Sequence, residues 1–597
     1  MFQTFAVSSS PEQGPPRLAA LRGALAEAGL HGFLVPRADV HQGEYVAPRD
    51  ARLEWLTGFT GSAGFCAVLE NIAGVFIDGR YRVQVRSQVA DTFTPVHWPE
   101  VQLADWLLDH LPDGGIVGFD PWLHTVDELA SLTRKLRDSK IVLRPVDNMI
   151  DPLWSDQPAA PTAPFTAHPL ELSGEAHDAK RTGLAADLKA ACTVITLPDS
   201  IAWLLNIRGT DIERNPVPHA FAILHDDARV TLFAGQGKAD AIADHLGPMV
   251  TVAAQDSFAA HLGKLTGTVQ IDPKSCPAAV ATILTKAGAT ISHASDPCVL
   301  PKATKNATEI AGAKAAQHRD AVAMVQFLAW LDAEAPKGHL TEIDVVQKLE
   351  GFRTATNALR DISFETISGA GPNAAIVHYR VTDDTNRAVN AGELLLVDSG
   401  GQYRDGTTDI TRTISIGQPT DEHRACYTRV LRGMVAISRL RFPKGLSGQH
   451  IDAFARAPLW EAGLDYDHGT GHGIGSYLSV HEGPQGISRR ATTPFVPGMI
   501  VSNEPGYYRE GAFGIRIENL IAVVEAPAIA GGDSRDMLAF ETLTYVPLDR
   551  RLIETDQLTR AERDWIDRYH ATTLAVLAQD LHGDALDWLQ QACAPLT

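Results

Sequence analysis

The sequence predicts a multidomain α/β protein, and its length and its pattern of apolar runs support that prediction. The chain has 597 residues. One hydrophobic core seldom supports so long a chain, so we expect about two to four domains. A helical stretch, residues 18–28, alternates with short apolar runs at 32–35 and 74–77, which are typical of buried strands. The same alternation returns after residue 164, which predicts a second α/β domain of similar architecture.

A polar, proline-rich stretch at residues 156–164 separates the two predicted α/β domains. Proline does not continue a helix interior or a central strand, so we place a boundary there. A long helical stretch, 309–333, opens a third region that runs to the end of the chain. The predicted domains are residues 1–155, 156–304 and 305–597.

Composition and charge exclude several classes of protein. Hydrophobic residues make up 45% of the chain and charged residues 21%, which are ordinary globular values. The net charge of −20, without any block of Lys and Arg, argues against a nucleic-acid partner. The sequence contains no apolar run of about 18 residues and no secretory signal, so we expect no membrane partner and a cytoplasmic location.

The six cysteines are scattered without CxxC spacing. This distribution indicates neither a zinc knuckle nor a disulfide framework. We therefore expect reduced thiols that are mostly packed in the protein interior.

The third region contains an unusual pair of aspartates. An apolar run, 394–397, ends in Asp398, and two glycines separate it from a β-branched run that contains Asp409. This pattern predicts a hairpin that carries both carboxylates into one interior space. A single aspartate at a strand end is more often a turn or cap residue, so the prediction depends on the neighbouring segments.

Three further segments supply similar residues. His468 and His472 lie in a glycine-rich stretch, where the backbone can approach a ligand closely. An apolar run ends shortly before Glu504, and residues 514–519 alternate in strand fashion, which places Arg516 and Glu518 on one face. The candidate ligand set therefore contains two aspartates, Asp398 and Asp409, one histidine of this stretch, and two glutamates, Glu504 and Glu518.

Four carboxylates in one pocket raise one another's pKa values and cost several kcal/mol when they are left uncompensated. Two divalent cations would balance the four negative charges and leave room for one hydroxide. Hard oxygen donors with a single imidazole suit Mn²⁺, Co²⁺ or Zn²⁺. Such a metal pair polarises a carbonyl and generates hydroxide near neutral pH, which is the chemistry of peptide hydrolysis.

These residues resemble those of the pita-bread metallopeptidases and, among them, of the three-domain cytosolic Xaa-Pro aminopeptidases (aminopeptidase P). The resemblance implies two creatinase-like N-terminal α/β domains followed by a C-terminal pita-bread α+β catalytic domain. It covers essentially the whole chain. The further matching segments are residues 41–48, 58–64 and 78–81 in the first domain, 202–209 and 215–217 in the second, and 377–379, 468 and 480–484 in the third.

The resemblance also implies how the ligands share two metal ions, for which Mn²⁺ is the first expectation and Co²⁺ or Zn²⁺ the alternatives. Asp409 and Glu518 would bridge the ions. Asp398 would bind one ion, and His472 and Glu504 would bind the other. A homodimer is a further implication of the resemblance.

Residues around the metals acquire expected roles in the same way. His378, His468 and His481 would line the substrate cleft, with His378 and His481 contacting the scissile peptide and stabilising the tetrahedral intermediate. Three other residues also have expected roles. Arg80, from the N-terminal domain, would contact the substrate. Arg516 would orient the acidic ligands, and Tyr508 would form a hydrogen bond near the metals.

The implied activity is removal of the first residue from a peptide whose second residue is proline. A hydroxide held between the two metals would attack the first carbonyl. Glu504 would take its proton and pass it to the proline nitrogen, which must be protonated to leave. The expected partner is therefore a peptide with an Xaa-Pro N-terminus.

Other activities of the same fold stay open at this point. A prolidase cleaves only Xaa-Pro dipeptides with the same five ligands, although the second α/β domain favours the aminopeptidase. Methionine aminopeptidase needs no such upstream domains. A creatine amidinohydrolase-like enzyme and a non-catalytic peptide-binding scaffold do without the metals, and the intact ligand set argues against both.

Overall fold

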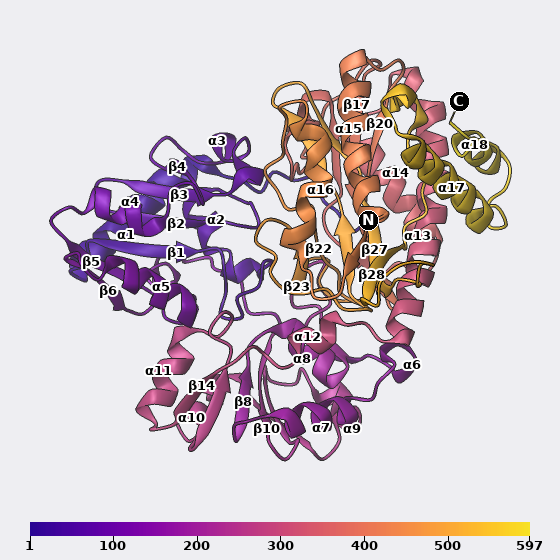
Figure 1. Cartoon of the computed structure of the whole chain (residues 1–597). Coiled ribbons are helices and arrows are strands. Elements are labelled where there is room, and N and C mark those ends of the chain that lie inside the picture. The colour runs from indigo at the N-terminus through magenta and orange to yellow at the C-terminus, as the bar shows by residue number, and fades with distance from the viewer. Residues whose placement is uncertain (597) are drawn as a thin grey trace. The chain divides into compact units, whose positions relative to one another are not determined.

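The computed structural model describes residues 1–596. The chain forms two compact units (Figure 1). We call Ser8–Val299 the N-terminal unit, and Met1–Val7 together with Leu300–Thr597 the C-terminal unit. Each unit is described by itself.

The N-terminal unit begins with a six-stranded mixed sheet in the order β4-β3-β2-β1-β5-β6. The central strand β1 pairs antiparallel with β2 and parallel with β5. Its side chains alternate between two hydrophobic clusters: Phe33 and Val35 pack with helix α1 (Gly14–Glu27), and Leu34 packs with helix α4 (Leu103–His110) on the other face. The strands are β1 (Gly32–Pro36), β2 (Phe65–Leu69), β3 (Ala73–Ile77), β4 (Thr94–His97), β5 (Gly115–Phe119) and β6 (Ile141–Pro145).

A second six-stranded sheet in the same unit repeats this design. Its order, β12-β11-β10-β8-β13-β14, matches the first sheet position by position. The parallel and antiparallel pairings are also the same at every step. The repetition of α/β architecture predicted from the sequence is therefore present. The strands are β8 (Cys192–Ile195), β10 (Ala220–His225), β11 (Val230–Ala234), β12 (Val250–Ala254), β13 (Thr268–Ile271) and β14 (Thr290–His293).

The C-terminal unit places strands between two layers of helices (Figure 1). On one side, α13 (Ala307–Glu334) and α14 (Glu342–Ala355) cover β17 (Leu394–Ser399) and β20 (Ile410–Ser415). On the other side, α15 (Asp421–Ser438) packs against the same sheet region through Leu394 and Ile515. This α+β arrangement, with helices on both sides of the strands, is the predicted pita-bread architecture. Further helices of this unit are α16 (Gly448–Trp460), α17 (Arg560–Leu577) and α18 (Asp584–Ala592).

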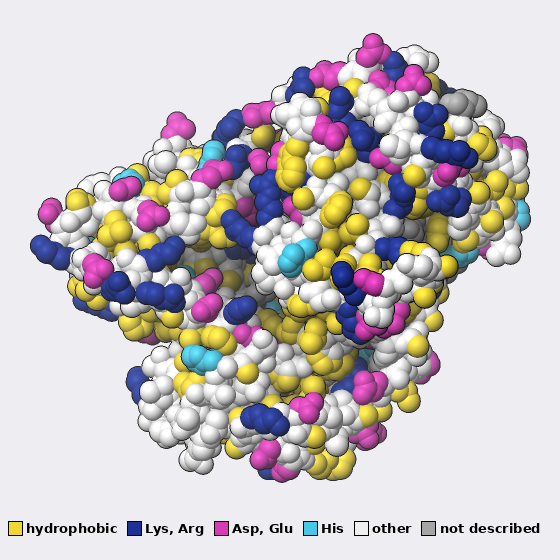
Figure 2. All heavy atoms as spheres, in the orientation of Figure 1, with side chains coloured by type: hydrophobic (Ala, Val, Ile, Leu, Met, Phe, Trp, Pro, Cys, Tyr) yellow, Lys and Arg dark blue, Asp and Glu magenta, His cyan; other side chains and the backbone are white. Residues whose placement is uncertain are grey.

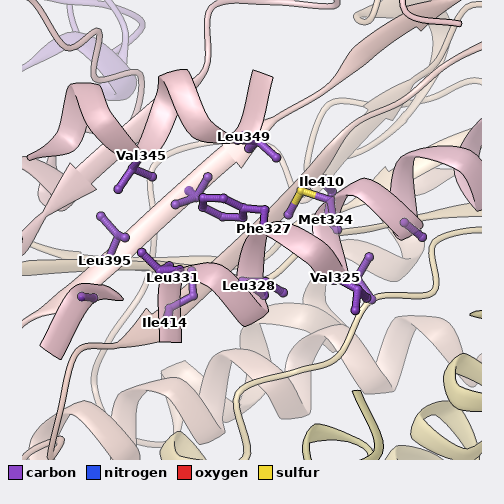
Figure 3. Packing of buried hydrophobic residues seen from close by; sticks show 14 of the residues in the cluster. Met324, Val325, Phe327, Leu328, Leu331, Val345, Leu349, Leu395, Ile410 and Ile414 are labelled. Atoms are coloured by element: carbon purple, nitrogen blue, oxygen red, sulfur yellow. The ribbon is translucent and has the colours of Figure 1, made fainter. Parts of the chain in front are cut away.

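The core beneath α13 is built from helix and strand side chains that meet face to face (Figure 3). Phe327 of α13 lies between Leu349 of α14 and Leu395 of β17, and all three are at most 1% exposed. Asn306 and Glu309 form a capping box at the start of α13, which satisfies backbone N–H groups there. Burial of each such apolar side chain stabilises the fold by about 1.5–3 kcal/mol. This core fixes the sheet from which the first two acidic residues project.

The predicted hairpin between Asp398 and Asp409 is right in its pairing and wrong in its connection. Strands β17 and β20 pair directly, with Asp398 opposite Thr411. The segment between them is not a tight turn, because β18 (Gly401–Tyr403) and β19 (Gly406–Thr407) pair with each other in a separate sheet. The chain leaves β17 at Gly400, where a Cβ atom would lie 1.9 Å from the Thr408 carbonyl oxygen. Only glycine fits this close approach.

Two other local predictions are corrected. His472 lies in a short strand, β22 (Gly471–Gly473), rather than in a loop. The predicted strand over 514–519 is two strands, because β26 (Phe513–Arg516) ends before Glu518 and β27 (Asn519–Glu525) begins after it. The Glu518 N–H instead donates to the Thr411 carbonyl (3.1 Å). Because the Glu518 backbone pairs with Thr411, the predicted strand is interrupted at Glu518.

Some global predictions are also addressed by the structure. All six cysteines are buried free thiols, as expected. Among residues 1–596, no helix has both the length and the apolar character needed to cross a bilayer. On the face shown in Figure 2, basic and acidic side chains are interspersed.

Candidate metal centre

All five predicted ligands lie in the C-terminal unit, on strands or immediately beside them. The ligand atoms of Asp409, His472 and Glu518 lie within 4.8 Å of one another. His472 Nε2 is 3.4 Å from Asp409 Oδ2 and 3.4 Å from Glu504 Oε1. Asp398 is in β17, Asp409 precedes β20, His472 is in β22, Glu504 follows β24 (Ile500–Asn503), and Glu518 lies between β26 and β27.

The strand that carries His472 fits its neighbours because glycines flank the histidine. A Cβ atom on Gly471 would lie 1.9 Å from the Ser502 carbonyl oxygen, and one on Gly473 would lie 2.2 Å from the Glu482 carbonyl oxygen. The glycines therefore allow β22 to lie tightly between β24 and β23 (Glu482–Ile487). These contacts fix the backbone from which the imidazole projects.

Ser502 connects two of the ligands and was not identified from the sequence. Its hydroxyl accepts the backbone N–H of His472 (2.9 Å) and donates to Glu504 Oε1 (3.1 Å). In the sequence, Ser502 stands two residues before Glu504, and this spacing places both side chains on the same side of an extended segment. The hydroxyl therefore fixes the His472 backbone and the Glu504 carboxylate relative to each other.

The electrostatics of the pocket show a conflict among like charges. Burial raises the pKa of Asp409 to about 6, and the charge of Asp398 adds to this effect while the hydrogen bond with His472 opposes it. Burial and the charges of Asp409 and Glu504 hold the pKa of Glu518 well above its usual range. Burial lowers the pKa of His472, but the hydrogen bond to Asp409 and the charge of Glu504 outweigh it and raise that pKa to about 9. The pocket therefore favours added positive charge.

The hydrogen bonding of two carboxylate oxygens indicates whether metal ions fit this pocket. Asp398 Oδ1 and Glu518 Oε1 are buried and have no hydrogen-bond partner within the described part of the chain. The other oxygen of each is held: Arg516 Nη2 donates to Asp398 Oδ2 (2.6 Å), and Thr411 Oγ1 donates to Glu518 Oε2 (2.8 Å). An unsatisfied buried carboxylate oxygen is costly, and a cation satisfies it. The donor set therefore fits divalent metal ions.

Arg516 links the acidic ligands to the edge of the site. Its Nε donates to Thr411 Oγ1 (3.2 Å), and its Nη1 donates to the Tyr508 hydroxyl (2.6 Å). Burial raises the pKa of Tyr508 to about 12 against the opposing charge of Arg516, so the phenol is protonated at neutral pH. The same hydroxyl lies 2.8 Å from His468 Nε2. Polar contacts therefore run without a break from Asp398 to His468.

The other two predicted cleft histidines lie beside residues of this site. The ring of His481 meets the ring of His472 edge to face, with 4.2 Å between the centroids. His378 follows Val377, whose carbonyl oxygen accepts a hydrogen bond from Arg516 Nη2 (3.3 Å). Both histidines are half-buried.

Arg80 belongs to the N-terminal unit. Its guanidinium pairs with the Asp78 carboxylate (2.7 Å) and lies over the Tyr81 ring, 5.3 Å from the centroid. The side chain is 23% exposed. The backbone N–H of Arg80 donates to Asp78 Oδ1 (3.0 Å) at the start of a short 3₁₀ turn, Gly79–Tyr81.

A cluster of four carboxylates, three of them buried, and one imidazole defines a metal-dependent hydrolase of the pita-bread type. Models of known families match almost the whole chain. Metallopeptidase family M24 matches residues 311–525, and the C-terminal region of that family matches 536–596. Creatinase/Prolidase N-terminal domains match residues 17–153 and 156–309.

Individual relatives match over their full length. A protein of Laccaria bicolor named a probable Xaa-Pro aminopeptidase P is 39% identical over 97% of this chain and 93% of its own length. Aminopeptidase P1 of Arabidopsis thaliana is 37% identical over 97% of this chain and 99% of its own. The crystal structure of an X-prolyl aminopeptidase from Caenorhabditis elegans, described as a cytosolic enzyme with a di-nuclear active site, has 32% identity and a TM-score of 0.93 over 98% of this chain and 100% of that one. The chain belongs to metallopeptidase family M24.

Proposed function

We propose that this peptidase removes the first residue from peptides whose second residue is proline. The observation that carries the proposal is the cluster of candidate ligands, three of which have ligand atoms within 4.8 Å of one another, with two buried carboxylate oxygens that have no hydrogen-bond partner among residues 1–596. Relatives that match over the full chain, with its two upstream α/β domains, bear the name aminopeptidase P. Family and site therefore agree on metal-dependent cleavage at a peptide N-terminus.

The metal site would hold two divalent cations, and we propose Mn²⁺, with Co²⁺ and Zn²⁺ as alternatives. Asp409 and Glu518 would be shared between the ions, Asp398 would serve one ion, and His472 and Glu504 would serve the other. When bound, such a pair supplies Lewis-acid polarisation of a carbonyl and activation of water near neutral pH. Oxygen donors with one imidazole fit these ions better than ions that prefer thiolates.

Glu504 is the proposed proton carrier. Its Oε1 is fixed by the Ser502 hydroxyl (3.1 Å) and lies 3.4 Å from His472 Nε2. The carboxylate would accept a proton from the attacking water and deliver it to the proline nitrogen, which leaves only when protonated. A fixed carboxylate is suited to both transfers because it keeps one position through the cycle.

The three histidines are the proposed contacts for the substrate. His481, beside His472, and His378, beside the residue held by Arg516, would donate hydrogen bonds to the scissile peptide as charge develops on it. His468 would orient the substrate from its contact with the Tyr508 hydroxyl. Tyr508 and Arg516 would hold this arrangement by their mutual hydrogen bond.

We further propose four properties of the whole protein: domain boundaries after residues 155 and 304, a substrate contact by Arg80, assembly as a homodimer, and a cytoplasmic location. The family matches, which end at 153 and 309, support the boundaries. The description of the Caenorhabditis elegans relative as cytosolic supports the location. Analytical ultracentrifugation tests the dimer.

The competing function is a prolidase restricted to dipeptides. The purified, Mn²⁺-loaded protein is assayed with Arg-Pro-Pro and with Arg-Pro, and free arginine is quantified. An Arg-Ala-Pro peptide is the control for proline selectivity. We expect release of arginine from Arg-Pro-Pro and not from Arg-Ala-Pro. Hydrolysis of Arg-Pro alone would establish the prolidase instead.

A further inference from the structure

A buried arginine lies outside the ligand set and beside the loop that carries His468. Arg456 is on α16 and is 3% exposed. It has a salt bridge within its own helix, in which Nε donates to Asp452 Oδ2 (2.8 Å). Three further hydrogen bonds reach residues 465–468: Nη1 donates to Asp465 Oδ1 (2.8 Å) and to the Tyr466 carbonyl (2.7 Å), and Nη2 donates to the His468 carbonyl (2.7 Å).

The same loop is tied back to α16 by a second route. The Arg456 guanidinium lies over the Tyr466 ring, 3.9 Å from its centroid. The Tyr466 hydroxyl bonds to Thr470 Oγ1, which donates to Asp452 Oδ1 (2.6 Å). Arginine, aspartate, threonine and tyrosine thus close a ring of contacts around the loop. A guanidinium suits this position because its donors lie in one plane at fixed angles.

The metal ligands next to this loop have separate supports. The His472 backbone is held by Ser502 Oγ, and the Thr470 backbone is held in sheet-like bonds with Ile487 and Glu504. None of these bonds uses the Arg456 side chain. Its hydrogen bonds therefore act on the His468 side of the loop, where the imidazole meets Tyr508.

We propose that Arg456 is a positioning residue for His468. The planar guanidinium fixes the backbone of residues 465–468. The His468 imidazole therefore keeps its contact with the Tyr508 hydroxyl and its direction toward the substrate. The proposal rests on the proposed role of His468 in the cleft. Lysine at this position keeps the positive charge beside Asp452 and cannot reproduce the planar set of bonds to the loop.

A double-mutant cycle tests the proposal. Arg456→Lys, His468→Ala, the double variant and the wild type are compared as full-length, Mn²⁺-loaded proteins on Arg-Pro-Pro. We expect Arg456→Lys to lower kcat by about tenfold or more, with KM changed by less than about threefold. In the His468→Ala background we expect the same substitution to lower kcat by less than about twofold, because the residue through which it acts is gone. Losses that multiply would overturn the proposal.

A matched control separates positioning from general stability. Arg52, in the N-terminal unit, is also buried and forms a two-bond pair with Asp151 (2.7 and 3.0 Å). Arg52→Lys should lower the melting temperature and leave kcat of the folded protein unchanged. An equal loss of kcat in Arg52→Lys, or loss of bound metal in Arg456→Lys, would overturn the proposal.

A second variant keeps the test decisive if Arg456→Lys does not fold. Asp465 has a side chain that is 36% exposed and accepts from both Arg456 and Arg489 (2.6 Å). Asp465→Asn should give a smaller loss of kcat that also disappears in the His468→Ala background, and a loss that persists there would contradict the proposal. His468→Ala with wild-type kcat would refute the proposed role of His468 itself, which distinguishes that failure from the failure of Arg456.

Discussion

Two clusters of buried charge, one in each unit, show what distinguishes a structural network from a metal site. In the N-terminal unit, Asp211 Oδ1 lies 2.6 Å from Lys238 Nζ, and Asp39 Oδ2 lies 3.4 Å from His219 Nε2. The Asp211 carboxylate also accepts the backbone N–H of His219 (2.7 Å). Each acid in this cluster faces a basic group of the same chain, so we call it the balanced cluster.

The cluster of candidate metal ligands in the C-terminal unit has no such balance, so we call it the unmatched cluster. Four carboxylates share one imidazole and the guanidinium of Arg516. The pKa values express the difference between two buried aspartates: burial raises both, but the hydrogen bond with His219 and the nearby histidine charges lower the pKa of Asp39 to about 2, whereas that of Asp409 stays raised at about 6. Burial is thus common to both clusters, and only the unmatched one calls for cations.

The largest expected effect is on catalysis when the unmatched cluster loses a ligand. Asp409→Ala should lower kcat/KM for Arg-Pro-Pro by at least about 10³-fold, because it removes a carboxylate proposed to be shared by both metals. In the metal-free protein the same change should leave stability unchanged or raise it by about 1 kcal/mol, since it relieves like-charge repulsion. Steady-state kinetics and urea unfolding with a chelator measure the two effects. Wild-type activity in this variant would overturn the site assignment.

The balanced cluster should respond in the opposite way. Asp211→Ala leaves Lys238, which is 3% exposed, without its acid, so we expect the free energy of unfolding to fall by about 3–5 kcal/mol. Urea unfolding monitored by circular dichroism measures this loss. The double variant with Lys238→Met should recover part of it, because no unpaired charge is left. A neutral effect of Asp211→Ala would contradict the structural interpretation of this cluster.

Acid should weaken the N-terminal unit through His41. Burial and the charge of His219 lower the pKa of His41 to about 4. The unfolded histidine has a pKa of about 6.5 and binds its proton first, so the stability contribution is complete above about pH 6.5 and falls as the pH drops toward 4. The total loss is about 3 kcal/mol. Urea unfolding of wild type and His41→Gln at pH 7, 6 and 5 measures it, and parallel pH profiles for the two proteins would contradict it.

The smallest expected effect concerns a hydroxyl that supports a ligand. Thr411→Val removes the donor to Glu518 Oε2 and the acceptor of Arg516 Nε without changing the side-chain shape. We expect about a tenfold weaker Mn²⁺ affinity, measured by activation of the metal-stripped protein. Thr413→Val is the matched control, because its hydroxyl bonds to the Arg516 backbone instead of to a carboxylate. Equal effects of the two substitutions would contradict a specific role for Thr411.

Much of the fold and the site could be predicted from the sequence because the signals are local. Apolar runs mark strands such as β1 and β3, and helical spacing marks α13. Each of the five candidate ligands lies in a strand or immediately beside one, and apolar runs mark several of these strands in the sequence. The family resemblance is carried by the same residues.

The features that were missed depend on contacts between distant segments. The excursion after Gly400 exists because Thr408 packs against it, and the break at Glu518 exists because its N–H pairs with Thr411 more than 100 residues earlier. Arg456 gives no signal in the sequence, since an arginine in an amphipathic helix is usually solvent-exposed. Its importance is visible only when the loop at 465–468 lies beside it.

The most direct measurement is the metal stoichiometry of the unmatched cluster. Metal-stripped protein is titrated with Mn²⁺ by calorimetry, and bound metal is then quantified by elemental analysis. The charge imbalance predicts two ions per chain in the wild type, two in a folded variant of the N-terminal unit such as His41→Gln, and fewer than two in Asp409→Ala. Peptide cleavage by protein that contains no metal, or wild-type protein that binds no Mn²⁺, would contradict the account.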